Sequence, residues 1–201
     1  MLRKTQLMRV SGLVGTLAAL MFVSPRAAQA QTWIGQLLGT SENPANSSPA
    51  TGFVTISFNS ISHNLNVMLN WSGLVGGNPT AAHIHCCVAP GSNIGVAVGL
   101  TGFPSTTSGS YTNNFDLTNP AVYTAAFRNN FGGGTAAGAE TALINGLNAG
   151  NAYANIHNAQ YPGGEIRANV TVTPEPSSVL LMAVGLGGVI AVVSRRRNTA
   201  V

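Results

Sequence analysis

Apolar and polar side chains alternate along several short segments of the 201-residue chain. The clearest is LNVMLNW (65–71), in which every second residue is apolar and the others are mostly asparagine. Because successive side chains of a strand point to opposite faces, this period of two predicts a strand with one buried face. The same reasoning predicts further strands over 32–38, 52–58, 80–88, 96–100, 109–117, 152–157 and 165–172.

The stretch 119–150 departs from this alternation. Pro120 suits the first turn of a helix, and the segment 120–130 that it opens is compatible with a short one. A run of three glycines follows, and then an alanine-rich segment, 136–147, which carries Leu143 and Leu147. Because the strands are short and closely spaced, we expect an all-β antiparallel sandwich or barrel with this helical insertion, rather than βαβ units.

Residues 1–30 have the order of a secretory signal peptide. Arg3, Lys4 and Arg9 precede an apolar run, and the segment ends at Ala28-Gln29-Ala30, which has the small-x-small pattern of a signal-peptide cleavage site. We therefore expect the mature chain to begin at residue 31. Export would place the domain in an oxidising compartment.

A second apolar run, 177–193, carries no charged residue and is closely followed by Arg195, Arg196 and Arg197. As a helix rising 1.5 Å per residue, it would reach about 25 Å, which is at the short end of the length that crosses a bilayer. Arginine clusters stay on the cytoplasmic side of a membrane, so the segment 31–173 is expected to face outward. The sequence thus predicts hydrophobic helices at both ends and a membrane contact through 177–193.

The net charge of +4 originates in these two ends. The segment 31–173 itself carries only two arginines against four carboxylates, namely Arg128 and Arg167 against Glu42, Asp116, Glu140 and Glu165. A mildly acidic domain without a basic patch does not suit a nucleic-acid partner.

The candidate chemistry lies in two of the predicted strands. Alternation places His83, His85 and Cys87 on one face of the strand 80–88, and His157 on the polar face of the strand 152–157. An H-x-H pair on a strand is separated by about 7 Å at the backbone, a spacing at which two imidazoles can bind one metal ion. With His157 as a third ligand and Cys87 or Glu165 as a fourth, the metal would be zinc or copper.

Two other interpretations of these residues stay open. The histidines can be structural and hydrogen-bonded, and the polar faces can simply be the solvated outside of a sandwich. Glu165 and Arg167 lie two residues apart on one face, which fits either a surface ion pair or a carboxylate that orients His157. His63, in a predicted hairpin turn, is expected to be solvated.

Cys86 and Cys87 are adjacent in the sequence and therefore cannot link distant segments. They can form a vicinal disulfide, remain reduced as thiols or a metal ligand, or pair between chains. A thiol–disulfide function is the least favoured of these, because the pair lacks the C-x-x-C spacing of redox motifs.

Four segments of the chain resemble the CHRD domain, the module first described in chordin. They are GTSENPANSSPATG (39–52), WSGL (71–74), AAHIH (81–85) and YANIHNAQYPGGEIRANV (153–170). The resemblance covers about residues 32–172 and implies an immunoglobulin-like or Cu,Zn superoxide dismutase-like β-sandwich. The family often has glycine after HIH, where this chain has Cys86. Its bacterial members offer no activity that can be carried over.

The C-terminus resembles a PEP-CTERM sorting signal. Pro174, Glu175 and Pro176 are followed by the apolar run and by Arg195, Arg196 and Arg197, so that all three parts occur in order over 174–201. The resemblance implies secretion and exosortase partners in a Gram-negative bacterium. It also implies passage through the inner membrane and delivery to the cell envelope or exopolysaccharide matrix.

Together, these observations favour a non-enzymatic, exported surface or matrix protein, since no catalytic set is legible in the sequence. The alternative function is a metal-binding β-sandwich that uses His83, His85 and His157.

Overall fold

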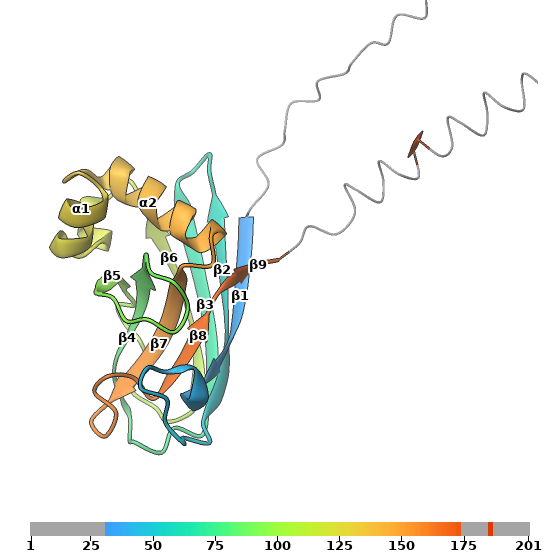
Figure 1. Cartoon of the computed structure of the whole chain (residues 1–201), viewed down its shortest axis with the longest axis vertical. Helices are drawn as coiled ribbons and strands as arrows, with labels where there is room; N and C mark the ends of the chain where they lie inside the picture. Colours follow the sequence, from blue (N-terminus) through green and yellow to red (C-terminus); the bar gives the residue numbers. More distant parts are fainter. Residues whose placement is uncertain (1–30, 174–184, 187–201) are drawn as a thin grey trace, which may run out of the picture.

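The computed structural model describes residues 31–173 and 185–186, and Figure 1 shows the folded part as one sheet with helices at one end. The strands are β1 Gln31–Leu38, β2 Thr51–Asn59, β3 Asn64–Ser72, β4 Pro79–Cys86, β5 Val96–Gly99, β6 Gly109–Asp116, β7 Ala152–Asn158, β8 Ile166–Asn169 and β9 Thr171–Val172. The helices are the 3₁₀ turns η1 Gly39–Ser41 and η2 Pro120–Val122, with α1 Ala125–Phe131 and α2 Ala136–Asn148.

The nine strands form a single antiparallel sheet with the order β5-β4-β7-β8-β1-β2-β3-β6, and β9 pairs with β1. The sheet curls on itself, so that strands from its two halves enclose a common core (Figure 1). Trp33, Ile56, Val67, Ile84 and Ile156 are fully buried there. The predicted all-β, sandwich-like fold with a short helical insertion is therefore confirmed.

The helical insertion begins later than the sequence suggests. Pro120 opens only the 3₁₀ turn η2, and Thr124 has an extended backbone before α1. The Thr124 side chain accepts a hydrogen bond from the backbone N–H of Phe127, which makes Thr124 the N-cap of α1. In α2, Leu143 and Leu147 are buried against the sheet, as their helical spacing predicts.

The predicted last strand, 165–172, is divided into β8 and β9, both of which pair with β1. Leu38 pairs with Arg167 of β8, whereas Trp33 pairs with Val172 of β9. Between these pairings the chain passes very close to Gly35, where a Cβ would lie 2.9 Å from the carbonyl oxygen of Asn169. Glycine is therefore needed for the two strands to approach each other.

The signal peptide 1–30 and the sorting segment 174–201, including all but two residues of the apolar run 177–193, lie outside the described residues. The terminal hydrophobic helices thus stay predictions. Within 31–173 and 185–186, none of the helices is both long enough and apolar enough to cross a membrane.

Candidate metal centre

The three histidines of the candidate site come from the neighbouring strands β4 and β7, which follow the edge strand β5 in the sheet. In the antiparallel pairing of β4 with β7, His83 lies opposite Asn155, His85 opposite Tyr153 and Ala81 opposite His157. Because alternation within each strand puts these polar side chains on one face, pairing brings together residues about 70 positions apart in the sequence.

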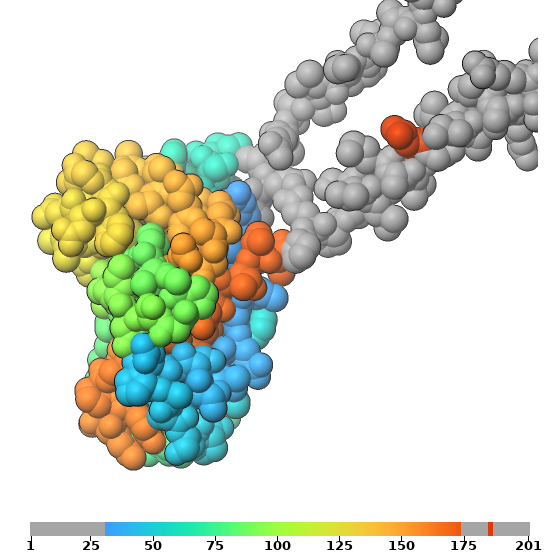
Figure 2. Space-filling view, in the orientation of Figure 1, coloured from blue at the N-terminus to red at the C-terminus, as the bar shows by residue number. Residues whose placement is uncertain are grey.

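Two loops cover this face, which the alternation pattern alone suggested would be solvated. The 42–48 loop follows β1 and η1, and the 88–95 loop follows β4. Asn43 donates to the carbonyl of Gly91 at 2.8 Å and Asn93 donates to the carbonyl of Asn43 at 2.6 Å, so the loops lie side by side, as Figure 2 shows in blue and green. As a result, Asn155 is only 2% exposed.

Arg167 and Tyr153 hold the 88–95 loop in place. The guanidinium of Arg167 lies 3.4 Å from the ring centroid of Tyr153, donates to the carbonyl of Ser92 at 2.9 Å and donates to Asn93 Oδ1 at 3.0 Å. This arrangement combines a cation–π contact with hydrogen bonds that a planar guanidinium is well shaped to make. The polar face is therefore largely covered: His85, Asn155 and Arg167 are buried, whereas His83 and His157 stay partly exposed.

Within this network, a potential ligand atom of His83, His85 and His157 each lies within 4.8 Å of the others. The ring centroids of His83 and His157 are 4.9 Å apart, those of His83 and His85 5.6 Å, and those of His85 and His157 6.2 Å. The predicted convergence of the three imidazoles is thus present in the structure.

Electrostatics favour neutral imidazoles here. Burial, together with the neighbouring His157 and His85, lowers the pKa of His83 to about 4. Burial also lowers the pKa values of His85 and His157 below their usual 6.5. Near pH 7 all three rings are therefore uncharged, which is the form that binds metals.

Two backbone carbonyls select the tautomers. Nδ1 of His85 lies 2.7 Å from the carbonyl oxygen of Ile94, and Nδ1 of His157 lies 3.0 Å from that of Pro162. A carbonyl oxygen can only accept a hydrogen bond, so in the neutral rings Nδ1 carries the hydrogen and Nε2 keeps its lone pair. Metal-binding histidines are commonly oriented by this kind of outer hydrogen bond.

His83 differs from the other two histidines. Its Nδ1 atom is buried and has no hydrogen-bond partner among the described residues. A buried polar atom of this kind costs free energy unless something satisfies it, and a metal ion would do so. A cluster of purely structural histidines would have all its buried nitrogens hydrogen-bonded, and this unpartnered nitrogen distinguishes the cluster from that case.

Cys87 and Glu165, the two predicted fourth ligands, are committed elsewhere. Cys86 and Cys87 form a vicinal disulfide, one of the three states that the sequence left open, and Cys87 Sγ lies 3.4 Å from the carbonyl oxygen of Ala142 in α2. The Glu165 carboxylate accepts hydrogen bonds from Ser48 Oγ at 2.6 Å, from the backbone N–H groups of Val75 and Gly76, and from the Asn158 amide. It thus anchors loops rather than orienting His157.

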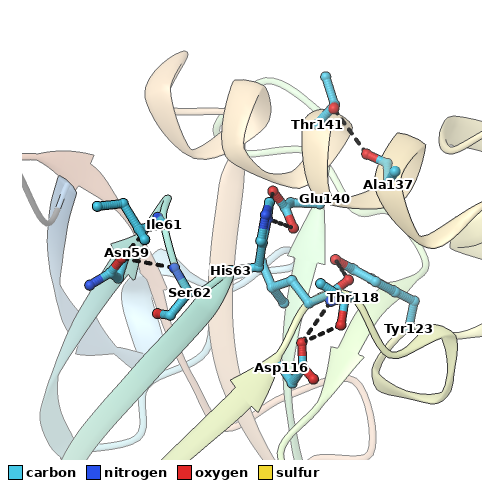
Figure 3. A network of polar contacts seen from close by, with 11 residues as sticks. Asn59, Ile61, Ser62, His63, Asp116, Thr118, Tyr123, Ala137, Glu140 and Thr141 are labelled. Atoms are coloured by element: carbon cyan, nitrogen blue, oxygen red, sulfur yellow. Dashed lines mark hydrogen bonds and ion pairs between the residues drawn. The ribbon is translucent and has the colours of Figure 1, made fainter. Parts of the chain in front are cut away.

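The surface ion pair that Glu165 and Arg167 could have formed is absent, because both residues are fully buried and have separate partners. His63 lies in the β2–β3 turn and is half-exposed, as expected. It also has a partner that was not expected, since its Nδ1 lies 2.9 Å from Glu140 of α2; Figure 3 shows this contact. A partner from a distant helix leaves no local trace in the sequence.

The structure adds one residue that the sequence analysis did not single out as a ligand. Asn155 stands between the rings, with its Oδ1 atom 3.1 Å from Nε2 of His85 and 2.9 Å from Nε2 of His157. On the other side, its Nδ2 atom is 3.5 Å from Glu42 Oε1, and burial raises the pKa of Glu42 to about 7. In the sequence, only its place two residues before His157 on the same strand face connected Asn155 with the site, and that spacing is not specific.

A comparison with protein families matches residues 35–170 to the CHRD domain. The chain belongs to the CHRD domain family. The adjoining residues 172–197 match the PEP-CTERM protein-sorting motif. No curated protein and no solved structure matches the chain. A CHRD domain followed by this motif indicates an exported protein that is recognised by an exosortase and sorted to the cell envelope.

Proposed function

We propose that this protein is a non-enzymatic component of the cell surface or exopolysaccharide matrix of a Gram-negative bacterium, and that its CHRD domain binds one transition-metal ion through His83, His85 and His157. The metal is zinc or copper, which both accept imidazole nitrogen. The observation that supports metal binding is the convergence of three neutral imidazoles, two with oriented lone pairs and one with an unpartnered buried nitrogen.

The size of the cluster fits such an ion after a small adjustment. Zinc–nitrogen bonds of about 2.0–2.1 Å in a tetrahedral site separate ligand nitrogens by about 3.3–3.4 Å. The nitrogens here lie within 4.8 Å of one another, so closure requires shifts of little more than about 1 Å. Rotation of imidazoles about their side-chain torsions provides movements of this size.

The surface role rests on the sorting motif and on the lack of a legible catalytic set in the sequence. Cell fractionation of the producing bacterium tests it, with expected recovery in the envelope or the extracellular matrix. A variant in which Arg195, Arg196 and Arg197 are replaced by alanine should be missorted. Recovery of the wild-type protein only from the cytoplasm, or efficient substrate turnover by the purified protein, would contradict the proposal.

Metal binding is tested on the full chain purified without a histidine tag. Elemental analysis and titration with Zn²⁺ and Cu²⁺ should give one metal ion per chain. The double variant His83→Ala/His157→Ala should lose this binding. The matched control is His63→Ala, which removes a half-exposed histidine from a turn outside the cluster.

Thermal unfolding of each variant without metal shows whether the fold survives the substitution. A ligand that binds only the folded state at 100 times its Kd stabilises it by about 2.7 kcal/mol, which raises the Tm of a domain of this size by several degrees. The wild type and His63→Ala should show this rise and the double variant should not. Equal metal binding by the wild type and the folded double variant would rule out the site.

A further inference from the structure

The residue between the three imidazoles is an amide. Asn155 Oδ1 is 3.1 Å from Nε2 of His85 and 2.9 Å from Nε2 of His157, while both rings use Nδ1 to donate to backbone carbonyls. Two nitrogen lone pairs therefore face an oxygen that also has only lone pairs to offer. Three acceptors directed at one small space repel one another unless a cation lies between them.

We propose that the side-chain carbonyl oxygen of Asn155 is the fourth ligand of the metal, and that it closes the site. This assignment rests on the metal binding proposed above. In a tetrahedral site with bonds of about 2.0–2.2 Å, each ligand pair is separated by about 3.3–3.6 Å. The observed nitrogen–oxygen distances are a few tenths of an ångström shorter, so the oxygen is already placed near the fourth vertex.

The surrounding structure fixes Asn155 in this position. It pairs across the sheet with His83 on β4 and with Arg167 on β8, so neighbouring strands hold its backbone on both sides. Its Nδ2 atom faces Glu42 Oε1, and a Cβ on Gly164 would lie 2.9 Å from Nδ2. Gly164 thus leaves room for the amide, and the Glu42 carboxyl keeps the amide nitrogen turned away from the histidines.

One rival arrangement satisfies the same atoms without a metal. If the Asn155 amide is turned by 180°, its NH₂ group can donate to Nε2 of both histidines, and Oδ1 then faces Glu42. That arrangement needs a protonated Glu42 carboxyl as the donor to Oδ1. It also leaves Nδ1 of His83 without a partner. In the metal-bound arrangement, rotation of the His83 ring can bring this nitrogen to the metal.

The two arrangements differ in what they require at position 155. A metal ligand must supply an oxygen, so Asn155→Asp should bind Zn²⁺ at least as tightly as the wild type, because the carboxylate keeps the oxygen and adds charge. An amide donor must supply N–H groups, which aspartate lacks. Asn155→Ala removes both and leaves the fourth position to water.

The test uses the untagged full chain with Co²⁺ as a spectroscopic substitute for Zn²⁺, and Zn²⁺ affinities from competition with a chelator. Asn155→Ala should lower the Zn²⁺ affinity at least about tenfold. Its Co²⁺ spectrum should change on addition of azide, which can replace a bound water, whereas the wild-type spectrum should not. Asn70→Ala, an exposed amide on β3, is the matched control and should behave as the wild type does.

The side-chain NH₂ signals of Asn155 in the ¹⁵N NMR spectrum give a measurement that needs no variant. They should shift on addition of Zn²⁺ to the wild type. The assignment of Asn155 would be overturned if Asn155→Ala bound the metal with the affinity and the spectrum of the wild type. It would also be overturned if a folded Asn155→Asp lost metal binding. Either result would leave the three-histidine site intact. A wild type that binds neither Zn²⁺ nor Co²⁺ would overturn both proposals.

Discussion

Gly146 in α2 lies directly over the vicinal disulfide and is the most informative position at which to perturb the domain. A Cβ at this position would collide with Cys86 Sγ and would lie 2.7 Å from Cys87 Sγ. Since Cys86 is fully buried and its sulfur is bonded to the next residue, neither sulfur atom can move aside freely. We therefore predict that Gly146→Ala destabilises the domain, although alanine is the better helix former.

The magnitude follows from two opposing contributions. Replacing glycine by alanine inside a helix gains up to about 1 kcal/mol from helix propensity. Overpacking a methyl group into a filled core costs about 1–3 kcal/mol, and a contact with two rigid sulfur atoms belongs at the upper end of that range. The expected net effect is a destabilisation of about 1–2 kcal/mol.

The sign should reverse when the sulfur atoms are absent. In a Cys86→Ala/Cys87→Ala background, the nearest remaining atom is the Cβ of residue 87 at 3.4 Å, an ordinary contact distance. There, Gly146→Ala should stabilise by up to about 1 kcal/mol, which gives a coupling energy of about 2–3 kcal/mol in the double-mutant cycle.

Reversible chemical denaturation of the four proteins, under non-reducing conditions, measures the free energies of unfolding. Asn145→Ala, at an exposed position of the same helix, is the control and should give a small stabilisation in both backgrounds. If Gly146→Ala stabilised the disulfide-containing protein, or if its effect were equal in the two backgrounds, the close packing of α2 on the disulfide would be refuted.

Two further predictions concern pH and the loop that covers the site. The pKa of His83 is lowered to about 4, so the unfolded chain binds more protons there and the metal-free domain gains stability as pH rises from 4 to 6.5. The pKa of Glu42 is raised to about 7, so the folded domain binds more protons there and loses stability as pH rises from 4.5 to 7. Glu42→Gln should therefore make the rise of unfolding free energy with pH steeper in denaturation experiments at pH 4.5–6.5, and an unchanged slope would contradict the opposing roles. Arg167→Lys should cost about 2–4 kcal/mol of unfolding free energy, because a single ammonium cannot replace the hydrogen bonds to Ser92 and Asn93 and the stacking on Tyr153. Faster proteolysis within 88–95 should accompany this loss, and a cost below about 0.5 kcal/mol would show that the guanidinium does not hold the loop.

Much of the candidate site was accessible from local patterns. Alternation alone put His83 and His85 on one face of a strand and His157 on the polar face of another, because the side-chain period of a strand does not depend on its neighbours. That β4 and β7 are adjacent is a matter of long-range pairing, and the sequence motif only suggested it. Asn155 had a place on the same face, but an asparagine is common on solvated strands and carried no distinguishing signal.

The hydrogen-bond partners of the other polar residues depended on contacts between segments far apart in the chain. Glu165 and Arg167, two residues apart on the same strand face, fitted either an ion pair or a carboxylate that orients His157. Instead, Glu165 bonds to Ser48, and Arg167 bonds to Ser92 and Asn93. These partners lie in loops that fold over the sheet. The path of a loop is set by a few side-chain hydrogen bonds rather than by a periodic pattern.

The sequence by itself determined the class of fold, the strand positions, the sorting motif and the face on which the histidines lie, because periodicity and targeting signals are local properties of the chain. Only the tertiary structure decided that this face is largely covered. The 42–48 and 88–95 loops contact Asn155 and His85, both of which are buried, and the carbonyls of Ile94 and Pro162 fix two tautomers. Removal from water and fixed lone-pair directions are what turn three nearby histidines into a candidate metal centre, and both arise only when distant segments pack together.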